Sequence, residues 1–212
     1  MRSSALLTSS TAYRANVTTV PAVVQQATVE TYDPDDQHLY IVGWDASNSV
    51  PIIYRVAKSG ATTIFYTFPS GYYYSTSISG IAYDHATQTF YITSQSGSGF
   101  NAPAILAITT GGAFSVLAGG ATSGTSDGTG SAASFSDPTG IAVDEADGAL
   151  YVGDHDRMRR ITTTGVVTTF TPAGSLGNSS YYYGNTFGVV WDAYDGNIYV
   201  ADASADVIRK VT

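Results

Sequence analysis

Aspartates at the ends of short apolar runs are the side chains best suited to chemistry. Asp154 and Asp202 each end such a run, Asp156 follows shortly after, and Trp44 stands near the end of an earlier run. Carboxylates gathered around a pore could hold Ca²⁺, which takes six to eight oxygen ligands. The chain has four apolar runs of this kind, and only two of them carry Asp at this position. A metal site needs more ligands than these two carboxylates supply. The pattern favours no metal and no cofactor, with calcium as the alternative, and makes these four residues candidates for binding a partner.

Catalytic groups are sparse. The chain has no cysteine and three histidines. His38 and His85 fall in or beside turns expected on the opposite face from His155, so two or three imidazoles cannot assemble around zinc. His155 has no serine in a G-x-S-x-G context to activate. This poverty of groups predicts that the protein is not an enzyme.

Two tyrosine triplets beside glycines are the strongest signal for binding. They comprise Tyr72, Tyr73, Tyr74, Tyr181, Tyr182 and Tyr183. Each triplet falls in a predicted loop ahead of an apolar run. Tyrosine offers a large rigid ring with a hydroxyl at its tip, which suits binding of proteins or sugars at low entropic cost. The alternative is that alternate rings pack the junction between sheets, as tyrosine often does in β-rich proteins.

A four-fold repeat must position these groups. Asp33, Asp84, Asp144 and Asp192 are each followed seven positions later by tyrosine, and they lie 51, 60 and 48 residues apart. In each unit an apolar run ends at the Asp, a short turn follows, and a second apolar run begins at the tyrosine. This spacing, with strands that are apolar on both sides, predicts an all-β propeller of four four-stranded blades.

The repeat also sets the boundaries of the expected units. Residues 1–212 form one propeller domain, with an extension at 1–15, a short strand at 16–22, and blades at about 23–70, 71–120, 121–174 and 175–212. The last unit stops after its third strand. We predict that the strand at 16–22 completes this blade, within one chain or between chains, because an open sheet edge invites aggregation. The rival is an amino-terminal strand without a partner.

The second half of the chain resembles the NHL-repeat family. The shared features are an Asp-Gly pair ahead of Phe135, the run Pro138-Thr-Gly-Ile-Ala-Val-Asp144, the run Leu150-Tyr-Val-Gly-Asp154, and the segment 197–212. The resemblance implies a β-propeller, usually of six blades, in which an aspartate such as Asp154 commonly caps the following turn. Four units are visible here, so the closure of the ring differs from the family pattern.

The resemblance also brings an enzyme alternative, because gluconolactonase-like propellers form a sister family. Those enzymes hold a central divalent metal with Glu, Asn and Asp, and the Asn precedes a first-strand glycine. The corresponding places here read Ile78-Ser79-Gly80, Pro138-Thr139-Gly140 and Thr186-Phe187-Gly188, without that Asn. Glu145 is expected in a turn on the face of the propeller opposite the metal site of those enzymes. A metal-dependent sugar-lactone hydrolase is therefore the alternative function.

Composition narrows the partners. Charged residues make up 12% of the chain and the formal net charge is −8, which disfavours nucleic acid and anionic membranes as partners. No apolar run approaches the length of a membrane span. The richness in Ser, Thr, Tyr and Gly is typical of extracellular adhesins and surface proteins, and Asn16 and Asn178 fit glycosylation sequons. We predict a non-catalytic binding or structural module, extracellular or surface-associated, whose partner is a protein, a glycan or copies of itself.

Overall fold

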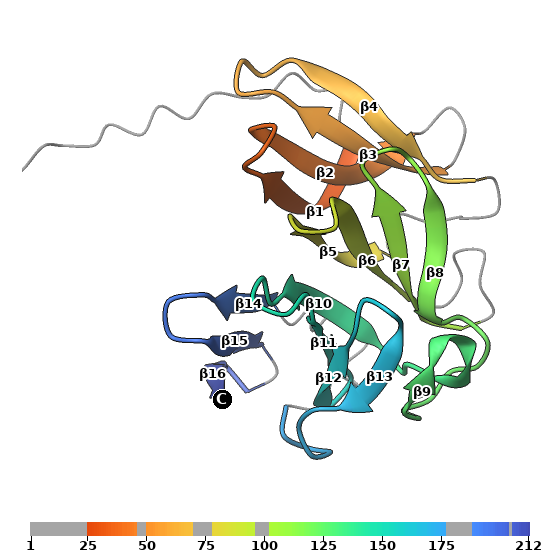
Figure 1. Ribbon diagram of the computed structural model, residues 1–212, viewed down its shortest axis with the longest axis vertical. Coiled ribbons are helices and arrows are strands. Elements are labelled where there is room, and N and C mark those ends of the chain that lie inside the picture. Colours follow the sequence, from red (N-terminus) through yellow and green to blue (C-terminus); the bar gives the residue numbers. More distant parts are fainter. Residues whose placement is uncertain (1–24, 46–49, 70–77, 96–101, 177–187, 204) are drawn as a thin grey trace, which may run out of the picture.

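The chain folds into four antiparallel sheets, as Figure 1 shows for the computed structural model. The structure describes residues 25–45, 50–69, 78–95, 102–176, 188–203 and 205–212. Within these ranges every regular element is a strand, apart from one short 3₁₀ turn at Gly130–Ala132. The same ranges contain no helix with the length and apolar character needed to cross a membrane. The prediction of an all-β chain is confirmed.

The sheets follow one another along the chain. The first contains β1 (Gln25–Asp33), β2 (His38–Asp45), β3 (Val50–Val56) and β4 (Thr62–Thr67). The second contains β5 (Ile78–Asp84), β6 (Thr89–Ser94), β7 (Ala104–Thr109) and β8 (Phe114–Gly119). The third contains β10 (Pro138–Val143), β11 (Leu150–Asp154), β12 (Arg157–Ile161) and β13 (Val166–Thr169), with the short β9 (Gly128–Thr129) beside β13. The fourth contains β14 (Gly188–Asp192), β15 (Asn197–Asp202) and β16 (Val207–Val211).

The repeated aspartate makes the turn between the first two strands of every sheet. Its carboxylate accepts a hydrogen bond from the backbone N–H two residues later, at 2.8 to 2.9 Å, in all four sheets. This side-chain turn satisfies a backbone donor that the hairpin would otherwise leave open. In the first and last sheets the repeated tyrosine closes the same turn. Tyr40 donates to Asp36 at 2.7 Å, and Tyr199 donates to Asp195 at 2.7 Å.

Side chains of consecutive sheets interdigitate in three hydrophobic clusters. The first cluster includes Tyr40, Ile53, Phe90 and Ile92, the second Ile105, Phe135, Leu150 and Val152, and the third Tyr151, Met158, Ile198 and Val200. A strand that contributes to both faces of its sheet must be apolar at successive positions, which explains the continuous apolar runs. Each of the two middle sheets is therefore buried between its neighbours.

The first strands of the four sheets lie side by side on the inner side of this stack. β1 packs on β5, β5 on β10, and β10 on β14 (Figure 1). Between the second and third sheets the approach is so close that side chains bind the facing backbone. Ser79 Oγ donates to the carbonyl of Pro138 at 2.7 Å, and Thr93 Oγ1 donates to the carbonyl of Thr139 at 2.6 Å.

The fourth sheet has three strands among the described residues. The edge of β16 lies where β4, β8 and β13 pair in the other sheets. The strand predicted to complete it, at 16–22, lies outside the described residues, as does the predicted extension at 1–15. Closure of the array within one chain or between chains thus stays a prediction.

Gly80 is required by the contact between the second and third sheets. A Cβ at this position would lie 2.5 Å from the carbonyl oxygen of Thr139, whereas a Cβ at the equivalent Gly188 would lie 3.7 Å from Ala201. We expect Gly80→Ala to lower the free energy of unfolding by about 1 to 3 kcal/mol, because the two strands must separate. The matched Gly188→Ala should change it by less than about 0.5 kcal/mol. Urea unfolding of both variants checks this, and equal losses would contradict the proposed difference in packing.

Candidate functional site

Asp154 lies at the end of β11, fully buried, and holds the loop that leads into β10. Its carboxylate accepts hydrogen bonds from the backbone N–H groups of Ser136 and Asp137, both at 2.8 Å. It also accepts one from the guanidinium of Arg159 at 3.0 Å. Burial raises the pKa of Asp154, against the effect of these three donors. Asp154 therefore caps the loop that precedes β10, whereas the family resemblance implies a cap of the turn that follows its own strand.

Arg159 extends the same network and is itself fully buried. Besides Asp154, its guanidinium donates to the carbonyls of Ser134 and Ser126 and to the carboxylate of Asp127, at 2.9 to 3.1 Å. Its charge also lies 5.3 Å from the centre of the Phe135 ring. The loop between β8 and β10 is thus fastened to the third sheet by one buried cation. Sequence reasoning missed this role of Arg159, because nothing in the run Arg157-Met-Arg-Arg160 distinguishes the arginine that points inward.

The other predicted carboxylates are also engaged in local structure. Asp202 is buried at the end of β15, where it pairs with Arg209 at 2.6 Å and accepts from the backbone N–H of Ala205 at 3.2 Å. Asp156 pairs with Arg157 at 2.8 Å and accepts from the backbone N–H of Gly174 at 2.9 Å. These contacts hold the turns that follow the second strands and the loop after β13.

The remaining predicted residues do not form a common described site with these aspartates. Trp44 is half-buried in β2, paired with Pro51 of β3. Both tyrosine triplets, Tyr72 to Tyr74 and Tyr181 to Tyr183, lie outside the described residues, as do Asn16 and Asn178. A binding role for Trp44, the triplets and the aspartates stays a prediction.

A cavity of about 320 Å³ lies where the first strands of all four sheets converge. Residues from each strand line it, including Thr28, Glu30, Ser79, Gly140 and Val189. Glu30 is exposed and contributes the one carboxylate of this lining within the described part of the chain. Glycines, aliphatic residues and the hydroxyl residues Thr28 and Ser79 form the rest of the lining, so Glu30 supplies the negative charge.

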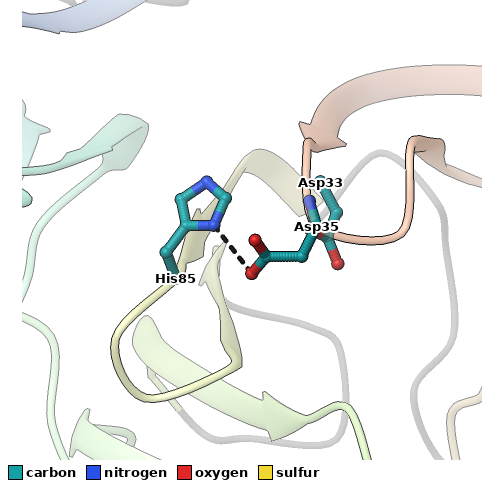
Figure 2. Close-up of side chains that lie close together, drawn as sticks. All are labelled: Asp33, Asp35 and His85. Carbon is teal, nitrogen blue, oxygen red and sulfur yellow. Dashed lines mark hydrogen bonds and ion pairs between the residues drawn. The ribbon is translucent and has the colours of Figure 1, made fainter.

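A second group of polar side chains gathers at the turns of the first three sheets. His85 Nδ1 lies 3.1 Å from the carboxylate of Asp35, and His85 Nε2 lies 3.8 Å from that of Glu145. Figure 2 shows His85 directed across the gap between two turns toward Asp35, with Asp33 beside it. Burial, followed by the carboxylate of Asp33, raises the pKa of Tyr83 to about 12. The neutral phenol therefore stays available as a hydrogen-bond donor to this group.

This turn cluster of Asp33, Asp35, His85 and Glu145 was missed by sequence reasoning. Its residues lie in three different units, and only the stacking of the sheets brings their turns together. One ligand atom from each of Asp33, Asp35 and His85 lies within 4.8 Å of the others, a spacing at which a divalent cation could be held. Asp33, however, already accepts the backbone N–H of Asp35 at 2.9 Å, as its equivalents do in every sheet. The observed contacts make the cluster a set of polar contacts that link adjacent turns.

Neither protein-family models nor curated protein sequences give a match to this chain. Solved structures do resemble it in fold. A chain of the nidogen–laminin complex has a TM-score of 0.63 at 19% identity, and an auxiliary nutrient binding protein from Bacteroides thetaiotaomicron has 0.62 at 22%. A gluconolactonase from Xanthomonas campestris has 0.55 at 13%. The similarity supports a fold of the β-propeller type.

The matched region makes up a larger share of this chain than of each known chain. The matches cover 87%, 87% and 81% of this chain, but 60%, 47% and 52% of the three known chains in the same order. The chain thus spans about half to three fifths of the structures that it resembles. The NHL resemblance, which the propeller type fits, stays a prediction at the level of the family.

The buried pair of Asp154 and Arg159 generates a stability prediction. Asp154→Asn removes the carboxylate but leaves the Arg159 charge buried, and we expect it to lower the free energy of unfolding by about 3 kcal/mol or more. Asp202→Asn is the matched control, because its partner Arg209 is 37% exposed, and should lose about 1 kcal/mol or less. Urea unfolding of both variants measures the difference. A stable Asp154→Asn variant would show that Arg159 does not depend on this carboxylate.

Acid should destabilise the fold. The pKa is lowered at Asp36, Asp127, Asp147, Asp156 and Asp195. For example, the Asp195 pKa falls because Lys210 and Tyr199 donate to its carboxylate. Lowered pKa values mean that the folded state favours the ionised carboxylates. Their contribution is complete above the ordinary pKa of 3.8 and is lost as the pH falls below it.

Burial of Asp154 raises its pKa and acts in the opposite direction, but it is one group against five. We expect the Tm, followed by circular dichroism, to be nearly level from neutral pH to about pH 4 and to drop below it. A Tm that rises on acidification would contradict the assignment of these ion pairs.

Proposed function

We propose that the protein is a non-catalytic binding or structural module that presents loops on a β-propeller platform. The observation that supports this most is that the predicted aspartates are engaged in local hydrogen bonds and ion pairs. Asp154, Asp156 and Asp202 each hold a turn or loop through backbone N–H groups and an arginine. Carboxylates engaged in this way position loops and are poorly placed to exchange protons with a substrate. Loops carried on rigid stacked sheets suit recognition.

The proposed partner is a protein or a glycan. The tyrosine triplets at 72–74 and 181–183 supply aromatic rings in loops between units, and such rings carry much of the energy of many interfaces. The net charge of −8 disfavours polyanionic partners. A surface or extracellular location fits the composition. In this proposal the strand at 16–22 completes the fourth sheet along the edge of β16.

The alternative is a metal-dependent hydrolase of sugar lactones. Its support is the fold shared with a gluconolactonase and the place of Glu30 in the cavity between the first strands. A metal ion bound there would need ligands besides Glu30. Glycines and backbone groups around it make this alternative the weaker one.

Metal content and lactone turnover separate the two functions. We expect purified protein, incubated with Ca²⁺, Mn²⁺ or Zn²⁺ and desalted, to retain less than one metal per chain and to hydrolyse glucono-lactone no faster than buffer. Stoichiometric metal with turnover would reverse the ranking. In that case Glu30→Gln should abolish both if the cavity is the active site.

The tyrosine loops are tested by paired substitutions. Tyr73→Ala and Tyr182→Ala should weaken binding to ligands found on a glycan array or a peptide array by about tenfold or more, with the Tm unchanged. Tyr194→Ala is the matched control, because this ring is 98% exposed in the turn between β14 and β15. A fall in Tm with intact binding would show that the triplets pack between sheets. The absence of any saturable ligand on both arrays would count against the platform role.

A further inference from the structure

Each of the first three sheets turns one face toward the next sheet along the chain, which we call its forward face. The forward face of the first sheet packs on the second, that of the second on the third, and that of the third on the fourth. The fourth sheet, β14–β16, has the same strand order and register. It therefore has a forward face as well, with no further described sheet to receive it.

The third strand shows this most clearly. Ile53, Ile105 and Met158 pair with the residue two positions after the repeated tyrosine, and all three are fully buried in the cluster with the next sheet. Ile208 holds the equivalent place, paired with Ala201, two positions after Tyr199. Ile208 is 76% exposed. A side chain that is apolar in every unit is thus left open to solvent in the last one.

The first strand of the sheet repeats the pattern. Ala82 and Ala142, two positions before the repeated aspartate, are 8% and 7% exposed, whereas their equivalent Val190 is 61% exposed. Ala201, Val207 and Ile208 also line a hollow of about 260 Å³ on the fourth sheet. Val190, Ala201 and Ile208 lie on one face of the three strands, beside Tyr199 and Lys210, which pair with each other in the same register. We call this face the open forward face.

The first sheet carries the matching half of such a contact. On the side away from the second sheet, Tyr32 of β1 is 54% exposed, and Leu39 and Ile41 of β2 are half-buried. The residues equivalent to Leu39 and Ile41 are at most 1% exposed in the other sheets, where they receive the forward face of the preceding sheet. They are Phe90 and Ile92, Leu150 and Val152, and Ile198 and Val200.

The part of this surface on β3 is already buried, at Ile52 and Tyr54. The part on β1 and β2, made of Tyr32, Leu39 and Ile41, is what we call the open backward face. The chain therefore carries both halves of a sheet-to-sheet contact, one on its last described sheet and one on its first. Within one chain the two halves do not cover each other, because Ile208, Val190 and Tyr32 are all more than half exposed.

We propose that the open forward face of one copy of this chain binds the open backward face of a second copy. The contact would continue the stacking seen three times within the chain. It is heterologous, so it leads from copy to copy in a filament unless the rotation closes a ring. It is also independent of the ligand of the tyrosine loops.

The absence of cysteine from the chain makes a direct test simple. Met158 packs in one cluster with Val200, and their equivalents on the two open faces are Ile208 and Ile41. We expect an Ile208→Cys chain and an Ile41→Cys chain, mixed and oxidised, to form a mixed disulfide dimer in preference to either homodimer. A Lys58→Cys chain is the control partner, because Lys58 is exposed in the turn after β3. It should form much less dimer with Ile208→Cys.

Self-association in solution gives the second measurement. The protein should show a mass above that of one chain by light scattering at micromolar concentration. Ile208→Asp should weaken this association by about tenfold or more while the Tm stays unchanged, since Ile208 is not buried within the chain. Val116→Asp, at a residue 40% exposed on β8 in the middle of the stack, should leave association intact.

Three outcomes would overturn the proposal. One is a protein that stays monomeric at every concentration. Another is association that Ile208→Asp and Val116→Asp weaken equally. The third is a double variant, Ile208→Cys with Ile41→Cys, that closes its disulfide only within one chain, which would show that the two faces meet in the same copy. Failure of the array and lactone experiments would not affect any of these readings.

Discussion

The fold depends on burial of both faces of each sheet. A four-stranded sheet of this composition cannot bury two apolar faces by itself, so each must stack on a neighbour. The three clusters between consecutive sheets meet that need for the second and third sheets on both sides. Burying one Leu, Ile or Phe contributes about 1.5 to 3 kcal/mol, so each cluster outweighs any surface ion pair, which contributes about 1 kcal/mol or less. Order along the chain follows, because each sheet stacks on the next.

Polar side chains fix the turns and loops at the ends of the stacked sheets. The turn aspartates satisfy backbone donors at one end of each sheet, and Asp154 with Arg159 does so at the other end of the third sheet. A buried ion pair gives little net stability, but removal of either partner is costly because the other charge stays buried. Arg159 therefore gives the loop between β8 and β10 one fixed arrangement. Rigid loops of this kind lose less entropy when a partner binds.

Much of the fold could be predicted from the repeat, because the interval from Asp to Tyr encodes a local hairpin. The turn at Asp84 and the start of β6 near Tyr91 depend on neighbouring residues alone. Contacts between units could not be predicted. His85 meets Asp35 and Glu145 only through the angle between stacked sheets, and sequence spacing does not contain that angle. The inward direction of Arg159 could not be predicted for the same reason, because most of its hydrogen-bond acceptors lie in the preceding loop.

The free energy gained by burying the exposed side chains of the last sheet must be compared with the cost of bringing two molecules together. Burial of Ile208 and Val190 would contribute about 1.5 to 3 kcal/mol each, whereas bringing two molecules together costs about 4 to 15 kcal/mol. Two side chains are therefore not enough for a stable contact. The opposing Tyr32, Leu39 and Ile41 add a comparable amount, and a strand paired along the edge of β16 would add main-chain hydrogen bonds. The two opposing faces together therefore contribute an amount within the range of that cost, and strand addition along the edge of β16 would stabilise the contact further.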